Sequence, residues 1–183
     1  MKVDETTIEG LRLLSIDVKE DDRGLFIKPY SLGELKNYHL MENVTEIFYS
    51  ISAVNVLRGM HFQVPPFTQE KIVGVTHGCI LDVVLDIRKN SNTYGDYTSF
   101  KLKAEDGKFL YIPGGLAHGF LSLSENSTVL YIVDTQYSPP HEGGIRYDSF
   151  GFNWPVSSPI VSERDRNFVV LDNFVSPFEM IKQ

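Results

Sequence analysis

The 183-residue chain contains one cysteine and fewer basic than acidic residues. A single thiol excludes an intrachain disulfide framework and any metal site built from several cysteines. Because Cys79 lies in an apolar run, we expect a buried structural thiol rather than a nucleophile. The 17 lysines and arginines against 24 acidic residues give a formal charge of −7, which argues against broad electrostatic binding to nucleic acid or to an anionic membrane.

Long apolar segments and leader signals are also missing. No run approaches the roughly 18 apolar residues of a membrane helix, and the residues after Lys2 lack the apolar core of a secretory signal. No internal repeat, low-complexity tract or linker rich in proline, glycine or serine divides the chain. The sequence therefore predicts a single domain over residues 1–183 and a cytoplasmic protein.

Short β-rich segments recur along the chain, whereas helix signals are few. In residues 79–88 the odd-numbered side chains share one face of a strand and the even-numbered ones the other. Similar segments lie at 11–18, 25–30, 45–53, 56–63, 71–76, 97–102, 109–112, 117–123 and 128–135. Capping-box spacing predicts short helices within 32–40, after Ser31, and directly after Ser162. Many short strands with so little helix predict an all-β antiparallel barrel or sandwich.

One segment combines a glycine turn with a histidine. Residues 109–120 predict a strand, a turn at Pro-Gly-Gly and a second strand that begins near His118. The spacing Pro-x-Gly-x-x-His resembles the second motif of the cupin superfamily, small β-barrels with a polar pocket at one end. Metal-binding cupins pair this motif with His-x-His, but here Gln63 replaces the second histidine, and a neutral amide is a poor ligand for a transition metal. We therefore expect no metal site.

Further motifs follow one another in a fixed order along the chain. Residues 21–26 read Asp-Asp-Arg-Gly-Leu-Phe, residues 58–63 read Arg-Gly-Met-His-Phe-Gln, and residues 162–165 read Ser-Glu-Arg-Asp. Between them lie Lys71, 82–88, 112–120, 130–131, 137–139, Glu142 and 154–155. This ordered set, which covers roughly residues 8–172, resembles the dTDP-4-dehydrorhamnose 3,5-epimerase family.

The resemblance implies a fold and a reaction. The fold is a cupin-like antiparallel β-barrel or jelly roll with a few short peripheral helices. The reaction removes and returns a proton at C3, C5 or both, next to the C4 ketone of a nucleotide-linked 4-keto-6-deoxyhexose, in deoxysugar and surface-polysaccharide (O-antigen) biosynthesis. No cofactor is expected, since the chemistry is proton transfer and no Gly-x-Gly-x-x-Gly follows a strand.

Four residues are expected to be catalytic by this resemblance. His61 matches the base, and the ordinary pKa of an imidazole, near 6.5, suits proton transfer at neutral pH. Asp165 matches the partner that orients it, Lys71 is expected to stabilise the enolate oxygen, and Tyr131 matches the opposing acid. Each also has a structural interpretation: a strand histidine, an acid in a first helical turn, a solvated lysine and a cross-strand aromatic.

The same resemblance marks residues for substrate binding: Arg23, Phe26, Lys28, Glu46, Phe48, Arg58, Gln63, His118, Tyr137, Glu142 and Arg164. Guanidinium groups suit a diphosphate, although the acids beside Arg23 also fit a turn salt bridge. Tyr137 and Phe26 can stack on a nucleobase or simply fill space. We expect His118 to hold the barrel and tune the pocket.

The position of Arg58 relative to His61 poses a geometric problem. Their odd separation sends the two side chains to opposite faces of a flat strand. Both can reach one pocket only if the strand bends, and the glycine between them permits that. We therefore predict a bulge near Gly59.

Two departures from the family pattern leave the nucleotide open. Lys28 stands where the family commonly has glutamate, and residues 46–48, Glu-Ile-Phe, replace a common Gln-x-Asn. Sugars linked to dTDP, CDP and GDP therefore all remain candidates, as does epimerisation at a single carbon.

Other interpretations stay open at this point. They are a nucleotide-keto-sugar isomerase, a metal-dependent cupin enzyme and a non-catalytic nucleotide-sugar-binding cupin. The family is typically dimeric with exchanged N-terminal strands. The resemblance therefore implies a homodimer in which a segment with Arg23 and Phe26 completes the partner's pocket.

Overall fold

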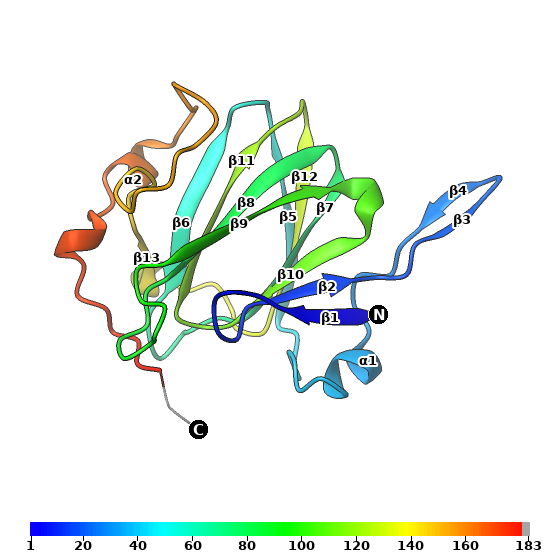
Figure 1. The fold of residues 1–183 in the computed structure, drawn as a ribbon, viewed down its shortest axis with the longest axis horizontal. Coiled ribbons are helices and arrows are strands. Elements are labelled where there is room, and N and C mark those ends of the chain that lie inside the picture. Colours follow the sequence, from blue (N-terminus) through cyan, green and yellow to red (C-terminus); the bar gives the residue numbers. More distant parts are fainter. Residues whose placement is uncertain (181–183) are drawn as a thin grey trace.

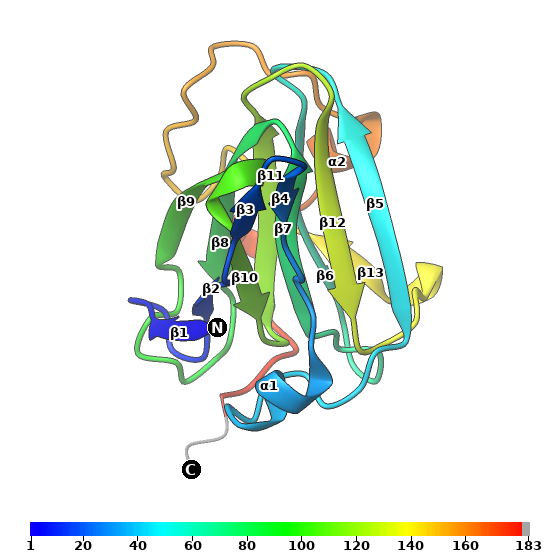
Figure 2. The same ribbon diagram turned by 90° about the vertical axis from the view of Figure 1, so that its right-hand side faces the viewer.

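The computed structural model describes residues 1–180, and two antiparallel sheets that face each other form its body (Figures 1 and 2). The first sheet has the order β1 (Lys2–Glu5), β2 (Arg12–Ser15), β10 (Lys108–Ile112), β7 (Lys71–His77), β12 (Ser127–Val133), β5 (Glu46–Ser52). The second has the order β13 (Glu142–Gly144), β6 (Leu57–Gln63), β11 (Leu116–Ser122), β8 (Cys79–Asp86), β9 (Tyr97–Lys103). The predicted all-β barrel is confirmed.

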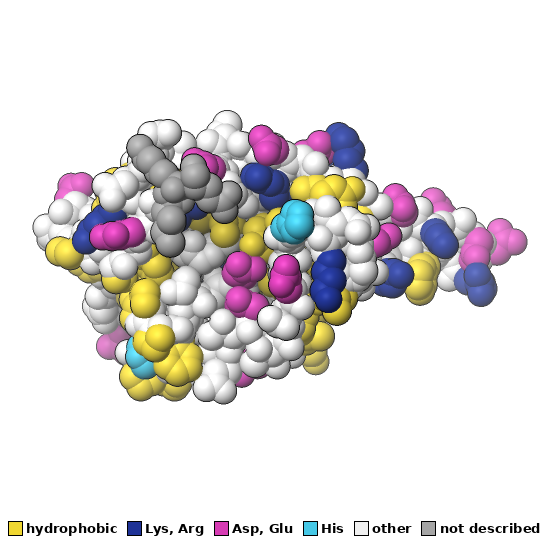
Figure 3. All heavy atoms as spheres, turned by 90° about the horizontal axis from the view of Figure 1, so that it is seen from below, with side chains coloured by type: hydrophobic (Ala, Val, Ile, Leu, Met, Phe, Trp, Pro, Cys, Tyr) yellow, Lys and Arg dark blue, Asp and Glu magenta, His cyan; other side chains and the backbone are white. Residues whose placement is uncertain are grey.

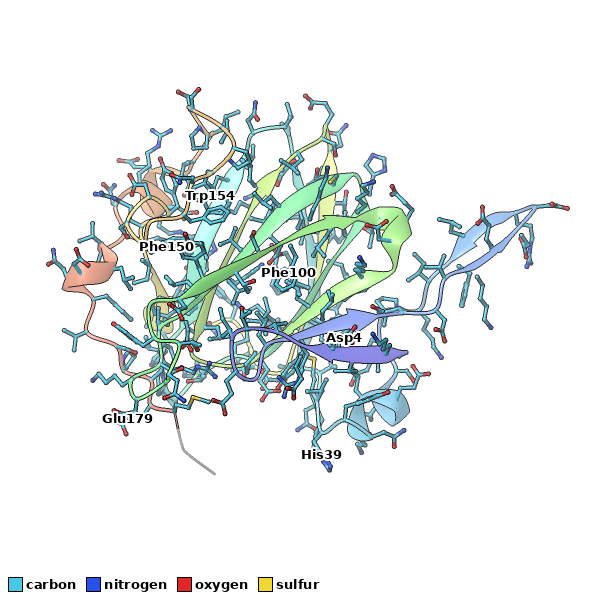
Figure 4. All side chains as sticks on the ribbon, in the orientation of Figure 1. Asp4, His39, Phe100, Phe150, Trp154 and Glu179 are labelled. Carbon is cyan, nitrogen blue, oxygen red and sulfur yellow. The ribbon has the colours of Figure 1, made fainter. Side chains whose placement is uncertain are left out.

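The main core fills the space between the two sheets. Val73 and Leu110 from the first sheet meet Val84 and Phe120 from the second, all of them buried. Phe100 of β9 packs against this cluster (Figure 4). In β8 the even-numbered side chains face this core, whereas the odd-numbered ones join a second cluster on the outer face of the sheet. The alternation predicted for 79–88 thus separates two buried layers.

Chain segments outside the barrel cover both outer faces. The C-terminal part packs Phe150 and Trp154 against the second sheet (Figure 4). Phe178 joins the same cluster. On the first sheet, Leu35 of α1 (Leu32–Lys36) and the following Met41 join a third cluster. Besides α2 (Glu163–Arg166), the described residues form only three short 3₁₀ turns: η1 (Ala104–Asp106), η2 (Pro139–His141) and η3 (Leu171–Asn173). No described helix is long and apolar enough to cross a membrane.

A hairpin stands apart from this body. Its strands, β3 (Lys19–Asp21) and β4 (Gly24–Phe26), pair only with each other and project away from the barrel with charged side chains along them (Figures 1 and 3). Phe26 is 62% exposed at its end. We call residues 19–26 the arm. A two-stranded hairpin alone is marginally stable in water, so the arm needs a surface to pack against.

Several local predictions differ from the structure. The strand expected over 25–30 ends at Phe26, and the helix expected within 32–40 stops at Lys36. The capping bond expected from the Ser31 side chain is absent. Strands β1, β3 and β13 were not predicted, since three or four residues of mixed polarity carry no alternation. Cys79 is only partly buried, because it begins β8 directly after a turn.

Candidate active site

A cavity of about 490 Å³ lies between the two sheets. Strands β5, β7 and β12 of the first sheet and β6 and β11 of the second supply most of its wall. The loop before β7, the chain after β12 and α2 supply the rest. Its lining residues are Glu46, Phe48, Ser50, Arg58, His61, Phe62, Gln63, Gln69, Lys71, His118, Phe120, Tyr131, Tyr137, Glu142 and Arg164. The structure therefore gathers most of the predicted site residues around one cavity.

The period of a strand explains which side chains of β5 face the cavity. Glu46, Phe48 and Ser50 line it, whereas the residues between them, Ile47 and Tyr49, are exposed on the other face. Ser50 was not among the predicted site residues. Its spacing of two from Phe48 was the signal for it.

The predicted bulge lies at Gly59 and is confirmed. His118 pairs with His61 and Phe120 pairs with Arg58, so three steps on β6 oppose two on β11. Gly59 has φ +142°, and a Cβ on it would lie 2.5 Å from the Cα of Gly119. Only glycine fits this backbone at this approach. The bulge lets Arg58 and His61 line the same cavity.

His61 is held by Asp165 from a distant part of the chain. Asp165 Oδ2 lies 3.0 Å from Nε2 of His61. The helix α2 begins at Ser162, whose hydroxyl accepts the backbone N–H of Asp165 at 3.0 Å, and this predicted cap is confirmed. Burial alone raises the pKa of Asp165, but the bond and charge of His61 and the N–H of Gly59 outweigh it and lower that pKa far below its usual range.

Arg164 joins this pair to the cavity wall. Its Nε donates to Asp165 Oδ1 at 3.1 Å, its Nη1 donates to Glu142 Oε1 at 2.7 Å, and its Nη2 lies 3.2 Å from Nε2 of His61. The phenol of Tyr137 donates to the other oxygen of Glu142 at 2.7 Å. These bonds hold a guanidinium at the cavity, where a diphosphate can bind it.

Lys71 brings a buried cation into the same cavity. The residue opens β7 and is 8% exposed. Burial lowers the pKa of Lys71 to about 8, against the opposing charges of Asp82, Asp134 and Glu142. The ammonium therefore predominates at neutral pH, where it can stabilise an oxyanion.

Tyr131 lies on β12, in the sheet that faces His61. Burial and the charge of Asp82 raise the pKa of Tyr131, opposed by the Ser50 hydroxyl and the Arg58 guanidinium. The phenol therefore keeps its proton until a strong base forms beside it, as a general acid must.

A second histidine–carboxylate pair lies behind the cavity wall. Nε2 of His118 is 2.8 Å from Oδ2 of Asp82, which is fully buried. His118 lines the cavity and braces β11 against β8, as expected. Asp82 was not among the predicted site residues, although it is an acid on the inward face of a strand, between Ile80 and Val84.

Three predicted binding residues lie elsewhere in the same chain. Arg23 and Phe26 are on the arm, Lys28 follows it, and all three are exposed. The Arg23 side chain is 90% exposed and bonds Asp21, the salt bridge that the flanking acids favoured. None of the three lines the cavity of its own chain. Their role in substrate binding stays a prediction.

Gln63 lines the cavity but also braces a loop. Its amide donates to the carbonyls of Phe67 and Gln136 and accepts the N–H of Ser138 at 2.7 Å. Among residues 1–180, no group of three His, Cys, Asp or Glu side chains is placed to hold a metal ion.

The chain is similar to known proteins over most of its length. Residues 5–173 match the family model for dTDP-4-dehydrorhamnose 3,5-epimerase. The enzyme of that name from Salmonella typhimurium is 38% identical over 177 residues, which cover 94% of this chain and 96% of that protein.

Solved structures agree with this match. The Bacillus anthracis dTDP-4-dehydrorhamnose 3,5-epimerase with TDP and PPi bound has a TM-score of 0.90 at 36% identity and covers 93% of this chain and 99% of that one. The Legionella pneumophila 3,5-epimerase in complex with dTDP-4-keto-L-rhamnose has a TM-score of 0.93 at 28% identity and covers 98% and 99%. The chain therefore belongs to the dTDP-4-dehydrorhamnose 3,5-epimerase family of isomerases.

Proposed function

We propose that this cavity inverts C3, C5 or both of a nucleotide-linked 4-keto-6-deoxyhexose, with His61 as base and Tyr131 as acid. One observation carries the proposal: His61, which contacts Asp165, and Tyr131 come from the two facing sheets and line one cavity. A sugar ring between the sheets would meet a base on one side and an acid on the other. Such an arrangement inverts a carbon, whereas carbonyl migration to a neighbouring carbon needs no acid on the opposite face.

The proton transfers assign a task to each group. Asp165 contacts Nε2 of His61, so Nδ1 is the ring nitrogen left to take the proton from the carbon next to the ketone. The C–H electron pair moves into the C4 carbonyl, and the Lys71 ammonium stabilises the enolate oxygen. Tyr131 then donates its proton to the opposite face of the same carbon. Solvent finally returns a proton to Tyr131 and removes one from His61.

A dTDP sugar is the first substrate to test, because the relatives bind TDP or a dTDP-keto-sugar. Arg58, Arg164 and Lys71 line the cavity and supply positive charge for the diphosphate despite the acidic chain. Of the residues that depart from the family pattern, Glu46 and Phe48 line it, whereas Lys28 does not. CDP and GDP sugars therefore belong in the same panel.

A homodimer is part of the proposal. The arm needs a surface to pack against, and its Arg23 and Phe26 lie outside the cavity of their own chain. A second copy whose cavity receives them would satisfy both. The cytoplasmic location of the protein stays a prediction from the sequence.

The test is incubation of the protein with dTDP-, CDP- and GDP-linked 4-keto-6-deoxyhexoses in deuterium oxide, read by NMR at C3 and C5. Deuterium should enter the inverted product, and His61→Ala should abolish this. His77→Ala, which removes an exposed histidine at the end of β7, is the matched control and should exchange normally. Unchanged exchange in His61→Ala would refute the base assignment. Wild-type protein that binds these sugars without any exchange would refute the activity.

A further inference from the structure

The acid candidate, Tyr131, carries a second aromatic ring on one face. Phe48 is its direct cross-strand partner in the pairing of β5 with β12. The two ring centroids are 4.8 Å apart and the ring planes differ by 14°, so the rings are stacked. Direct cross-strand neighbours come close enough for such contact, and stacking adds to the free energy of simple burial.

The other neighbours of Tyr131 belong to the body of the barrel. Val73 of β7 is its partner on the opposite side, and Tyr131 packs against the core between the sheets. The ring of His118 meets Tyr131 edge-on, with centroids 6.2 Å apart. Phe48 differs from these groups because it is 45% exposed and lines the cavity. It therefore covers one face of the Tyr131 ring from the edge strand β5.

The strand that carries Phe48 is itself held in place. β5 is the last strand of its sheet, and β12 is its partner there. Arg58 of β6 links the second sheet to β5, because its Nε donates to Oγ of Ser52, the last residue of β5, at 3.0 Å. The strand that carries Phe48 is thus tied to both sheets.

We propose that Phe48 is a positioning residue that fixes the phenol of Tyr131 for proton delivery. A tyrosine rotates about two side-chain bonds, and the acid works only when its hydroxyl points at the carbon that has lost its proton. The stacked Phe48 ring blocks rotation of the Tyr131 ring toward β5 and so keeps the phenol in one orientation in the cavity. Base chemistry at His61, on the facing sheet, does not depend on this contact.

Loss of this positioning should separate proton removal by His61 from proton delivery by Tyr131. Once His61 has removed a proton, the enolate either receives a proton from Tyr131 and inverts, or recovers one from His61 and keeps its configuration. A misplaced Tyr131 slows the first outcome only. The substrate then gains deuterium from solvent without inversion, because the proton on His61 exchanges before it returns.

The experiment compares Phe48→Leu, which keeps an apolar side chain but removes the ring, with Phe48→Tyr, which keeps the stack. Phe152→Leu is the matched control, because Phe152 stacks on Phe150 at a centroid distance of 6.4 Å and lies outside the cavity. Each protein is incubated with the most active keto-sugar nucleotide in deuterium oxide. NMR then follows deuterium in unreacted substrate and the amount of inverted product separately.

In Phe48→Leu, inversion should fall about tenfold while proton removal continues, so the ratio of exchange to inversion rises by a similar factor. Because Phe48 lines the cavity, KM is measured as well, but a change in substrate binding alone leaves the ratio of exchange to inversion unaltered. Phe48→Tyr and Phe152→Leu should both keep the wild-type ratio. A general loss of stability lowers both rates together, so it cannot produce this change.

An unchanged ratio in an active Phe48→Leu enzyme would overturn the inference, as would an effect confined to KM. This inference rests on the proposed function, and the two fail differently. If the wild-type protein exchanges no proton, the proposed function is wrong. If it inverts normally and Phe48→Leu inverts with the same ratio, only the role of Phe48 is wrong.

Discussion

Asp165 Oδ2 lies 3.0 Å from Nε2 of His61 and also accepts the backbone N–H of Gly59 at 3.1 Å. One carboxylate oxygen therefore contacts both the proposed base and the bulge that turns this base into the cavity. The orientation of the His61 ring and the shape of the bulge therefore both depend on Asp165.

Asp165→Asn should reduce the rate of epimerisation at least about 100-fold, because an amide cannot stabilise the imidazolium that forms when His61 takes a proton. Binding of dTDP, which involves no proton transfer, should change little. Single-turnover rates together with a dTDP titration check this. Wild-type rates in Asp165→Asn would exclude Asp165 as the partner of the base.

The stability of the same variant should depend on pH. The pKa of Asp165 is depressed in the folded chain, so its charge stabilises the fold above its unfolded pKa, about 3.9, and this contribution is lost as pH falls toward the folded pKa. Asp165→Asn should be about 1–3 kcal/mol less stable than wild type at pH 7. Urea unfolding at several pH values should show this difference shrinking below about pH 4. A gap independent of pH would contradict the ionic role.

Deprotonation of Lys71 should determine how activity declines at alkaline pH. Its pKa is lowered to about 8 by burial, so the ammonium is lost as pH rises through that value. Because the enolate needs the charged form, kcat/KM should decline above about pH 8. Lys71→Met should lose at least about 100-fold in kcat and lose this alkaline decline as well. Lys101→Met, at an exposed position of β9, is the control and should keep the full profile.

Gly59→Ala should destabilise the protein by about 2–4 kcal/mol, since its Cβ would lie 2.5 Å from the Cα of Gly119 at a φ of +142°. Gly33→Ala in α1 is the control. A Cβ there meets no heavy atom within 4 Å, and alanine favours a helix over glycine. Thermal unfolding of both variants checks the prediction. Equal melting temperatures would exclude the close approach of β6 to β11.

Exchange of the arm between subunits predicts rescue by mixing. His61→Ala has an intact arm and no base, whereas the double variant Arg23→Ala, Phe26→Ala has a base and a defective arm. Each should be nearly inactive alone. Co-expression should restore up to about a quarter of wild-type activity, because half of the dimers are mixed and each mixed dimer has one complete site. No rescue, with mixed dimers present, would exclude exchange.

Local patterns in the sequence determined the positions of most strands and of the bulge. Alternation defined most strands, and the two layers of β8 follow from its period of two. The odd separation of Arg58 and His61, with a glycine between them, was enough to predict the bulge at Gly59. These inferences succeeded because side-chain direction in a strand and the conformational range of glycine are properties of a few adjacent residues.

Only the tertiary structure decided how distant groups meet. It brought Asp165 and Arg164 to His61, put Asp82 behind His118, and set the register that stacks Phe48 on Tyr131. It also buried Lys71, which changes its pKa, and left the arm outside the cavity of its own chain. The physical reason is that strand register and burial arise from pairing across the whole barrel, whereas a sequence pattern fixes only the direction of each side chain within its own strand.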